Sequence, residues 1–116
     1  MKTDNVVSEK SLTFAIRIVR LYQHLTREKH EYVLSKQMLK SGTSVGANIR
    51  EALRGQSRQD FAAKMNKINE TEYWLELLYR TDYITDKEFR SIFADCKELV
   101  RILTSIVKTT REKTEL

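Results

Sequence analysis

The sequence contains no proline, three glycines and one cysteine in 116 residues. Proline and glycine form most tight turns, so a fold rich in loops or strands would use more of both. Their scarcity therefore favours long helices joined by short connections. The single cysteine, Cys96, excludes an intramolecular disulfide and suits a reducing cytoplasm.

Long apolar runs are also missing. No stretch approaches the roughly 20 consecutive apolar residues that cross a bilayer, and 32% of the residues are charged. Residues 1–10 lack the apolar core and the small-residue cleavage site of a secretory signal. We therefore expect a cytoplasmic protein that has no membrane partner.

Apolar residues recur with a helical period in four segments. These segments cover about residues 8–29, 34–54, 58–80 and 86–111. Thr85-Asp-Lys-Glu88 has the pattern of a capping box at the start of the fourth segment, and Ser57 is expected to cap the third. In the second segment the period keeps its phase across Gly42 and Gly46, so we expect a continuous helix in which these glycines let another backbone approach closely. Short connections imply antiparallel neighbours, and we predict an all-α, single-domain, up-down-up-down four-helix bundle.

The first helix carries a wider apolar arc than a small bundle can bury. Its apolar residues cover well over half of the circumference, whereas packing inside such a bundle needs a stripe of about 100° or somewhat more. The excess predicts a second, intermolecular contact. The arc consists of Leu12, Phe14, Ala15, Ile16, Ile18, Val19, Leu21, Tyr22 and Leu25.

Groups suited to catalysis are scarce. His24 and His30 have no partners at metal-ligand spacing, and Cys96 lies on the apolar face of the fourth helix, where it is best interpreted as a small buried hydrophobe. The segment 41–47 is rich in glycine and serine but lacks the spacing of a phosphate-binding loop. We expect no enzymatic activity, no cofactor and no metal.

One acidic residue falls inside an apolar face. Glu72 shares the face of the third helix with Met65, Ile68 and Leu75, where a buried carboxylate would need hydrogen-bond donors. Asn48 lies at the edge of the core face of the second helix. We predict that Asn48 and Glu72 meet as a structural polar clamp between the two helices; a ligand-binding or catalytic role is the alternative.

Basic residues form the clearest pattern in a chain whose net charge is +5. They lie in lengthwise stripes on the first two helices, and such stripes can follow a phosphate backbone. A solvated face is the alternative interpretation. Aromatic residues do not interleave with the stripes, so stacking of single-stranded bases is not indicated. The first contact candidates are Lys36, Lys40, Arg50 and Arg54, followed by Arg17, Arg20 and Arg27.

The second helix carries a recognisable motif. Its residues 34–52, LSKQMLKSGTSVGANIREA, resemble the signature of the bacterial four-helix bundle proteins encoded in 23S rRNA intervening sequences, the S23 family. Residues 60–61, 64–65 and 70–75 resemble the next block of that family, and residues 102–106 resemble its carboxy-terminal block. The resemblance covers nearly the whole chain.

This resemblance implies a four-helix bundle that assembles into a ring, typically a homopentamer, with no established enzymatic activity. Related basic bundles are accessory proteins of diversity-generating retroelements, where they bind nucleic acid and a reverse transcriptase. We therefore expect a homo-oligomeric accessory protein whose partners are RNA or DNA and a protein such as a reverse transcriptase. The alternative is a scaffold that binds another protein and uses its charge for solubility.

Overall fold

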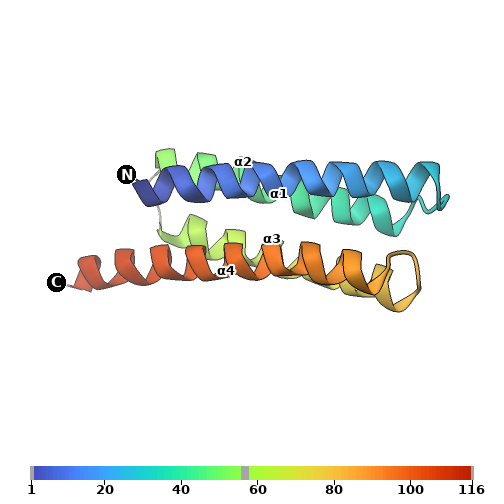
Figure 1. Cartoon of the computed structure of the whole chain (residues 1–116). Coiled ribbons are helices and arrows are strands. Elements are labelled where there is room, and N and C mark those ends of the chain that lie inside the picture. Colours follow the sequence, from blue (N-terminus) through green and yellow to red (C-terminus); the bar gives the residue numbers. More distant parts are fainter. Residues whose placement is uncertain (1, 56–57, 116) are drawn as a thin grey trace.

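The computed structural model describes residues 2–55 and 58–115, and it describes the side chains of residues 5–51 and 65–105. Within these ranges the chain forms α1 (Lys2–Arg27), α2 (Leu34–Gly55), α3 (Arg58–Arg80) and α4 (Asp86–Glu115). The helices lie lengthwise in an elongated bundle of 52 × 21 × 21 Å, in which α1 begins and α4 ends at the same end (Figure 1). Each helix packs against two neighbours in the cyclic order α1–α2–α3–α4. The predicted all-α, antiparallel four-helix bundle is confirmed.

Two helices are longer than the sequence indicated. Helix α1 begins at Lys2 rather than near Ser8, because Val7 continues the apolar stripe by a further turn and is fully buried. It ends at Arg27 rather than Lys29, since the chain turns at His30, whose φ is +54°. Helix α4 continues to Glu115 rather than ending near Arg111.

The core is formed by apolar residues of all four helices at the spacing that the sequence showed. Cys96 is fully buried among them, which confirms its interpretation as a small hydrophobe. The largest fully buried side chains are Phe14, Ile18, Leu25, Met38, Ile49, Ile68, Leu75, Leu78, Leu99 and Leu103.

Helix α2 is continuous through its glycines, as predicted. A Cβ atom added at Gly42 would lie 2.9 Å from both Cγ atoms of Ile18, and one added at Gly46 would lie 3.3 Å from the Ser11 hydroxyl. Ile18 and Ser11 both belong to α1, so the two glycines allow α1 and α2 to pack more closely than larger residues would. The seam between α1 and α2 is therefore closely packed at these two positions.

The beginning of α4 confirms a second local prediction. The Thr85 hydroxyl accepts a hydrogen bond from the backbone of Glu88 at 3.1 Å, and the Glu88 carboxylate accepts one from the backbone of Thr85 at 2.9 Å. This is the reciprocal capping box that the sequence Thr-Asp-Lys-Glu indicated. The equivalent cap predicted at Ser57 lies outside the described residues.

Candidate nucleic-acid interface

Helix α2 presents a row of exposed basic side chains. Lys36 and Lys40 are one helical turn apart and therefore lie on the same face. Among the described side chains, no carboxylate lies within ion-pairing distance of either ammonium group. Arg50 is also exposed, and its Nε donates a hydrogen bond to the Ser8 hydroxyl at 3.1 Å. The side chain of Arg54, the fourth candidate on this helix, lies outside the described residues.

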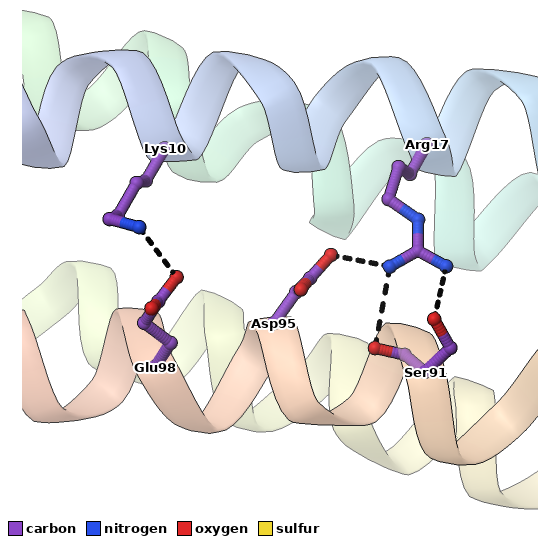
Figure 2. Close-up of polar contacts among 5 residues, drawn as sticks. All are labelled: Lys10, Arg17, Ser91, Asp95 and Glu98. Carbon is purple, nitrogen blue, oxygen red and sulfur yellow. Dashed lines mark hydrogen bonds and ion pairs between the residues drawn. The ribbon is translucent and has the colours of Figure 1, made fainter.

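The basic residues of α1 divide into two groups. Arg17 faces α4, where its guanidinium pairs with the Asp95 carboxylate at 2.6 Å and donates to the Ser91 hydroxyl at 2.9 Å and to the Ser91 carbonyl at 3.3 Å (Figure 2). Its charge is thus largely engaged within the bundle. Arg20 and Arg27 are exposed and make no ion pair with a described side chain. They remain the better candidates for an external anion.

An apolar stripe lies between these basic residues. Leu12, Ile16 and Val19 follow one another at helical spacing, and they are 41%, 51% and 37% exposed. Leu12 borders a shallow hollow that Arg50 also lines, whereas Ile16 borders another hollow together with Arg20. The excess apolar arc expected from the sequence is therefore present as an uncovered stripe, with basic side chains on both of its flanks.

The hollow on the α2 side of the stripe is lined mainly by small side chains. Because these residues leave little bulk above the α1–α2 seam, a large side chain of another molecule can be accommodated beside Leu12. The lining residues are Ser11, Leu12, Ala15, Thr43, Gly46, Ala47 and Arg50.

The predicted clamp between Asn48 and Glu72 is wrong. The Glu72 side chain is only 13% exposed, but it turns toward α4, where its carboxylate pairs with the Lys97 ammonium at 2.8 Å. A nearly buried carboxylate is better stabilised by a cation than by a neutral amide. The Lys97 ammonium nitrogen also lies over the Phe93 ring, 5.0 Å from its centroid. No hydrogen bond joins Glu72 to Asn48, although both side chains are among those described.

The polar contact between α2 and α3 is made by residues that sequence reasoning missed. The hydroxyl oxygens of Ser41 and Thr71 lie 2.9 Å apart in a hydrogen bond, and both residues are buried. Each hydroxyl also lies within hydrogen-bond distance of a carbonyl of its own helix, Ser41 of Met38 and Thr71 of Lys67. Because a hydroxyl has one proton, Thr71 shares its proton between Ser41 and Lys67, and Ser41 donates to Met38. In the sequence, both residues could be noticed only as hydroxyl residues on an apolar face. Such residues are common there, because their hydroxyl groups can hydrogen-bond carbonyls of the same helix.

The remaining reactive groups form no recognisable centre. Burial raises the pKa of the Cys96 thiol well above its usual value, and the nearby Glu72 and Asp95 carboxylates raise it further. The thiolate required for nucleophilic chemistry is thereby disfavoured. Among the described residues, no three His, Cys, Asp or Glu side chains are placed to hold a metal ion. In the same part of the chain, no helix combines the length and the apolar character required to span a bilayer.

Fold and surface together define a basic, antiparallel four-helix bundle with an uncovered apolar stripe. A family model described as 23S rRNA-intervening sequence protein matches residues 3–105, and the chain belongs to this family. This confirms the resemblance carried by residues 34–52.

A solved structure supports the same assignment. The chain is 57% identical to a protein with unknown function from the S23 ribosomal protein family of Bacteroides thetaiotaomicron VPI-5482, whose crystal structure was determined at 1.70 Å resolution. The match covers 91% of this chain and 98% of that one, with a TM-score of 0.85. No curated protein matches the sequence.

Proposed function

We propose that this protein is a non-enzymatic, homo-oligomeric accessory protein of the cytoplasm that binds RNA or DNA through the basic surface of α1 and α2. The observation that carries the proposal is the row formed by Lys36 and Lys40, whose charges are exposed and have no ion-pairing partner among the described side chains. Unpaired ammonium groups at helical spacing are available to phosphates, and each phosphate contact releases bound counterions.

The charges of the other helices support this choice of surface. On α4, Arg90 pairs with Asp86 at 2.7 Å and Lys97 pairs with Glu72 at 2.8 Å. On α3, Arg80 pairs with Glu76 at 2.9 Å. Because these cations already have anionic neighbours, an external phosphate gains less from them than from Lys36 and Lys40. Lys87 and Arg101 of α4 are also exposed without an ion-pairing partner among the described side chains, but they are fourteen residues apart and form no row. The face of α1 and α2 is therefore the more favourable one for a polyanion.

Self-association is the second part of the proposal. The stripe of Leu12, Ile16 and Val19 is uncovered in the single chain, and another copy of the chain would bury it. A ring of copies would repeat the basic row around its axis and so strengthen the local field. The family resemblance favours five copies. An alternative function, a scaffold for another protein such as a reverse transcriptase, is favoured by this same stripe.

Fluorescence anisotropy with a short RNA hairpin tests the nucleic-acid part. We expect the double variant Lys36→Gln, Lys40→Gln to bind at least tenfold more weakly and to lower the slope of log K against log[salt] by about two. The matched control is Lys67→Gln, Arg80→Gln, which removes the same charge from exposed positions of α3. Equal, small effects of the two double variants would contradict the proposed surface and favour the scaffold.

Light scattering tests the assembly part on the same samples. We expect the wild-type chain to have the mass of an oligomer, and the double variant Leu12→Gln, Ile16→Gln to have a much smaller mass while remaining helical. Both positions are exposed in the single chain, so these substitutions should not disrupt its core. A wild-type monomer would contradict this part of the proposal.

A further inference from the structure

The turn between α1 and α2 is exposed to solvent but firmly held. Its Glu31 side chain is buried, and its carboxylate accepts hydrogen bonds from the backbone amides of Val33, Leu34 and Ser35 at 3.1, 2.8 and 2.7 Å. The backbone amide of Glu31 in turn donates to the carbonyl of Leu25 at 2.9 Å. These bonds join the end of α1 to the start of α2, so the turn has a defined shape.

This fixed turn holds two large side chains away from the core. Tyr32 is 59% exposed and Val33 is 71% exposed. The Tyr32 hydroxyl lies 3.1 Å from Nδ1 of His30, and the two rings are tilted by 49° with centroids 6.4 Å apart. No parallel stacking partner of Tyr32 occurs among the described residues. An aromatic ring is thus presented to solvent on a rigid support, with at least part of its face uncovered.

Basic residues flank Tyr32 in the sequence. Arg27 and Lys29 precede the turn and Lys36 follows it, and all three are exposed. The carboxylate of Glu31 is occupied by backbone amides, so it contributes little anionic surface here. Glu28 is the other acidic residue of the connection. Glu88 of α4 also lies near enough to Lys29 to interact with it electrostatically. The three exposed cations still outnumber Glu28 and Glu88, and Lys36 joins the turn to the basic row of α2.

We propose that this turn is a binding site for unpaired nucleotides of a single strand, in which a base stacks on Tyr32 and the adjoining phosphates contact Lys36 and Lys29. Stacking on an aromatic side chain requires a base whose face is free, which a paired and stacked base in a duplex does not offer. The inference rests on the proposed nucleic-acid function and narrows it to a class of ligand.

The expectation that single-stranded bases do not stack on this protein concerned aromatic residues interleaved with the basic stripes of the helical faces. Tyr32 does not lie on a helix. It lies in the connection, where the fold brings it beside the ends of both stripes. Helical periodicity carries no information about such a position.

The proposal is tested by fluorescence anisotropy with a labelled 12-nucleotide RNA that has no self-complementarity, and with the blunt duplex formed from it and its complement. The variants are Tyr32→Ala, Tyr32→Phe and, as a matched control, Tyr73→Ala. Tyr73 lies on α3 and is 60% exposed, so its substitution removes an equally exposed ring from another surface. We expect Tyr32→Ala to weaken single-strand binding about five- to thirty-fold while duplex binding changes less than twofold. Tyr32→Phe, which keeps the ring, and Tyr73→Ala should bind as the wild type does.

The outcomes separate this inference from the function on which it rests. If the wild type binds the single strand but Tyr32→Ala binds it as tightly, the turn is not the site and the basic row still stands. An equal loss for single strand and duplex would also overturn the inference, since stacking would not explain it. If the wild type binds neither RNA, both proposals fail. Circular dichroism at the assay temperature establishes that each variant is folded.

Discussion

Helix α1 packs against its two neighbours in different ways. Toward α2 it meets glycine: a Cβ at Gly42 would lie 2.9 Å from Ile18, so this contact depends on close fit. Toward α4 the helices share fewer contacts, and the space between them is bridged by long polar side chains such as Arg17 on Asp95 (Figure 2). The contact of α1 with α2 thus depends chiefly on close packing, and its contact with α4 depends largely on charged side chains.

This difference indicates how the proposed functional surface is kept in place. The basic row, the apolar stripe and the turn that carries Tyr32 all belong to α1, α2 or their connection. Because α1 and α2 are packed closely, the positions of these features relative to one another are well defined. The contact between α1 and α4 includes half-exposed ion pairs, so its contribution to stability should depend more on salt and on substitution of single charges.

The largest effect is expected from a side chain added at the close-fitting seam. Gly42→Val would place a branched side chain where Ile18 already stands, and the Cγ atoms of Ile18 cannot move away because its β-branched χ1 is stiff. We expect the free energy of unfolding to fall by about 3 kcal/mol, at the upper end of ordinary overpacking. Urea denaturation followed by circular dichroism measures this change.

Two further variants sharpen the test. Gly46→Ala meets only the hydroxyl of Ser11 at 3.3 Å, and the gain in helix propensity of about 1 kcal/mol should offset this contact. We therefore expect a change of less than about 1 kcal/mol. In an Ile18→Ala background, Gly42→Ala should become stabilising, since the obstructing atoms are gone. A Gly42→Val protein as stable as the wild type would show that the seam has room to spare.

A smaller effect is expected from the buried carboxylate of the α1–α2 turn. Burial alone raises the pKa of Glu31, but the hydrogen bonds from the backbone amides of Ser35, Leu34 and Val33 together outweigh it and hold the pKa below its usual value of 4.5. Glu31→Gln removes the charge that strengthens these bonds. We expect it to lower the free energy of unfolding by about 2 kcal/mol at pH 7, as for other hydrogen bonds to a charged group.

The pH dependence of this effect has a definite sign. The pKa of Glu31 is lower in the folded chain than in the unfolded one, so its contribution is present above pH 4.5 and is lost as the pH falls through the folded value. The difference between wild type and Glu31→Gln should therefore shrink below pH 4.5. Glu88 also has a lowered pKa, but it is present in both proteins and cancels in the difference. A difference that stays constant down to pH 3 would contradict this account.

Much of the fold was predictable because it depends on periodicity and local caps. Apolar spacing placed the four helices, the unbroken phase across Gly42 indicated a continuous α2, and Thr85 with Glu88 indicated the capping box. These signals arise within one helix or at one helix end, so they can be read from neighbouring residues.

The missed features depend on relations between helices. Periodicity placed Glu72 on an apolar face, but it could not show which neighbouring helix would supply its partner, which is Lys97 of α4 and not Asn48 of α2. Similarly, Arg17 looked like any member of a basic stripe until packing placed Asp95 opposite it. The sequence also could not show that Glu31 is buried, because its burial depends on the conformation of the turn that carries Tyr32.

The smallest effect is expected on the charged side of α1. The side chains of Arg17 and Asp95 are 38% and 36% exposed, so solvent screens their pair and the coupling energy should be about 0.5–1 kcal/mol. A double-mutant cycle with Arg17→Gln and Asp95→Asn measures this coupling by urea denaturation. In 1 M NaCl the coupling energy should fall by more than half, because the Debye length at that ionic strength is only about 3 Å. The loss caused by Gly42→Val should not fall with it, since close fit carries no charge. A coupling above 2 kcal/mol that persists in salt would instead mean that this side of α1 is as tightly closed as the α2 side.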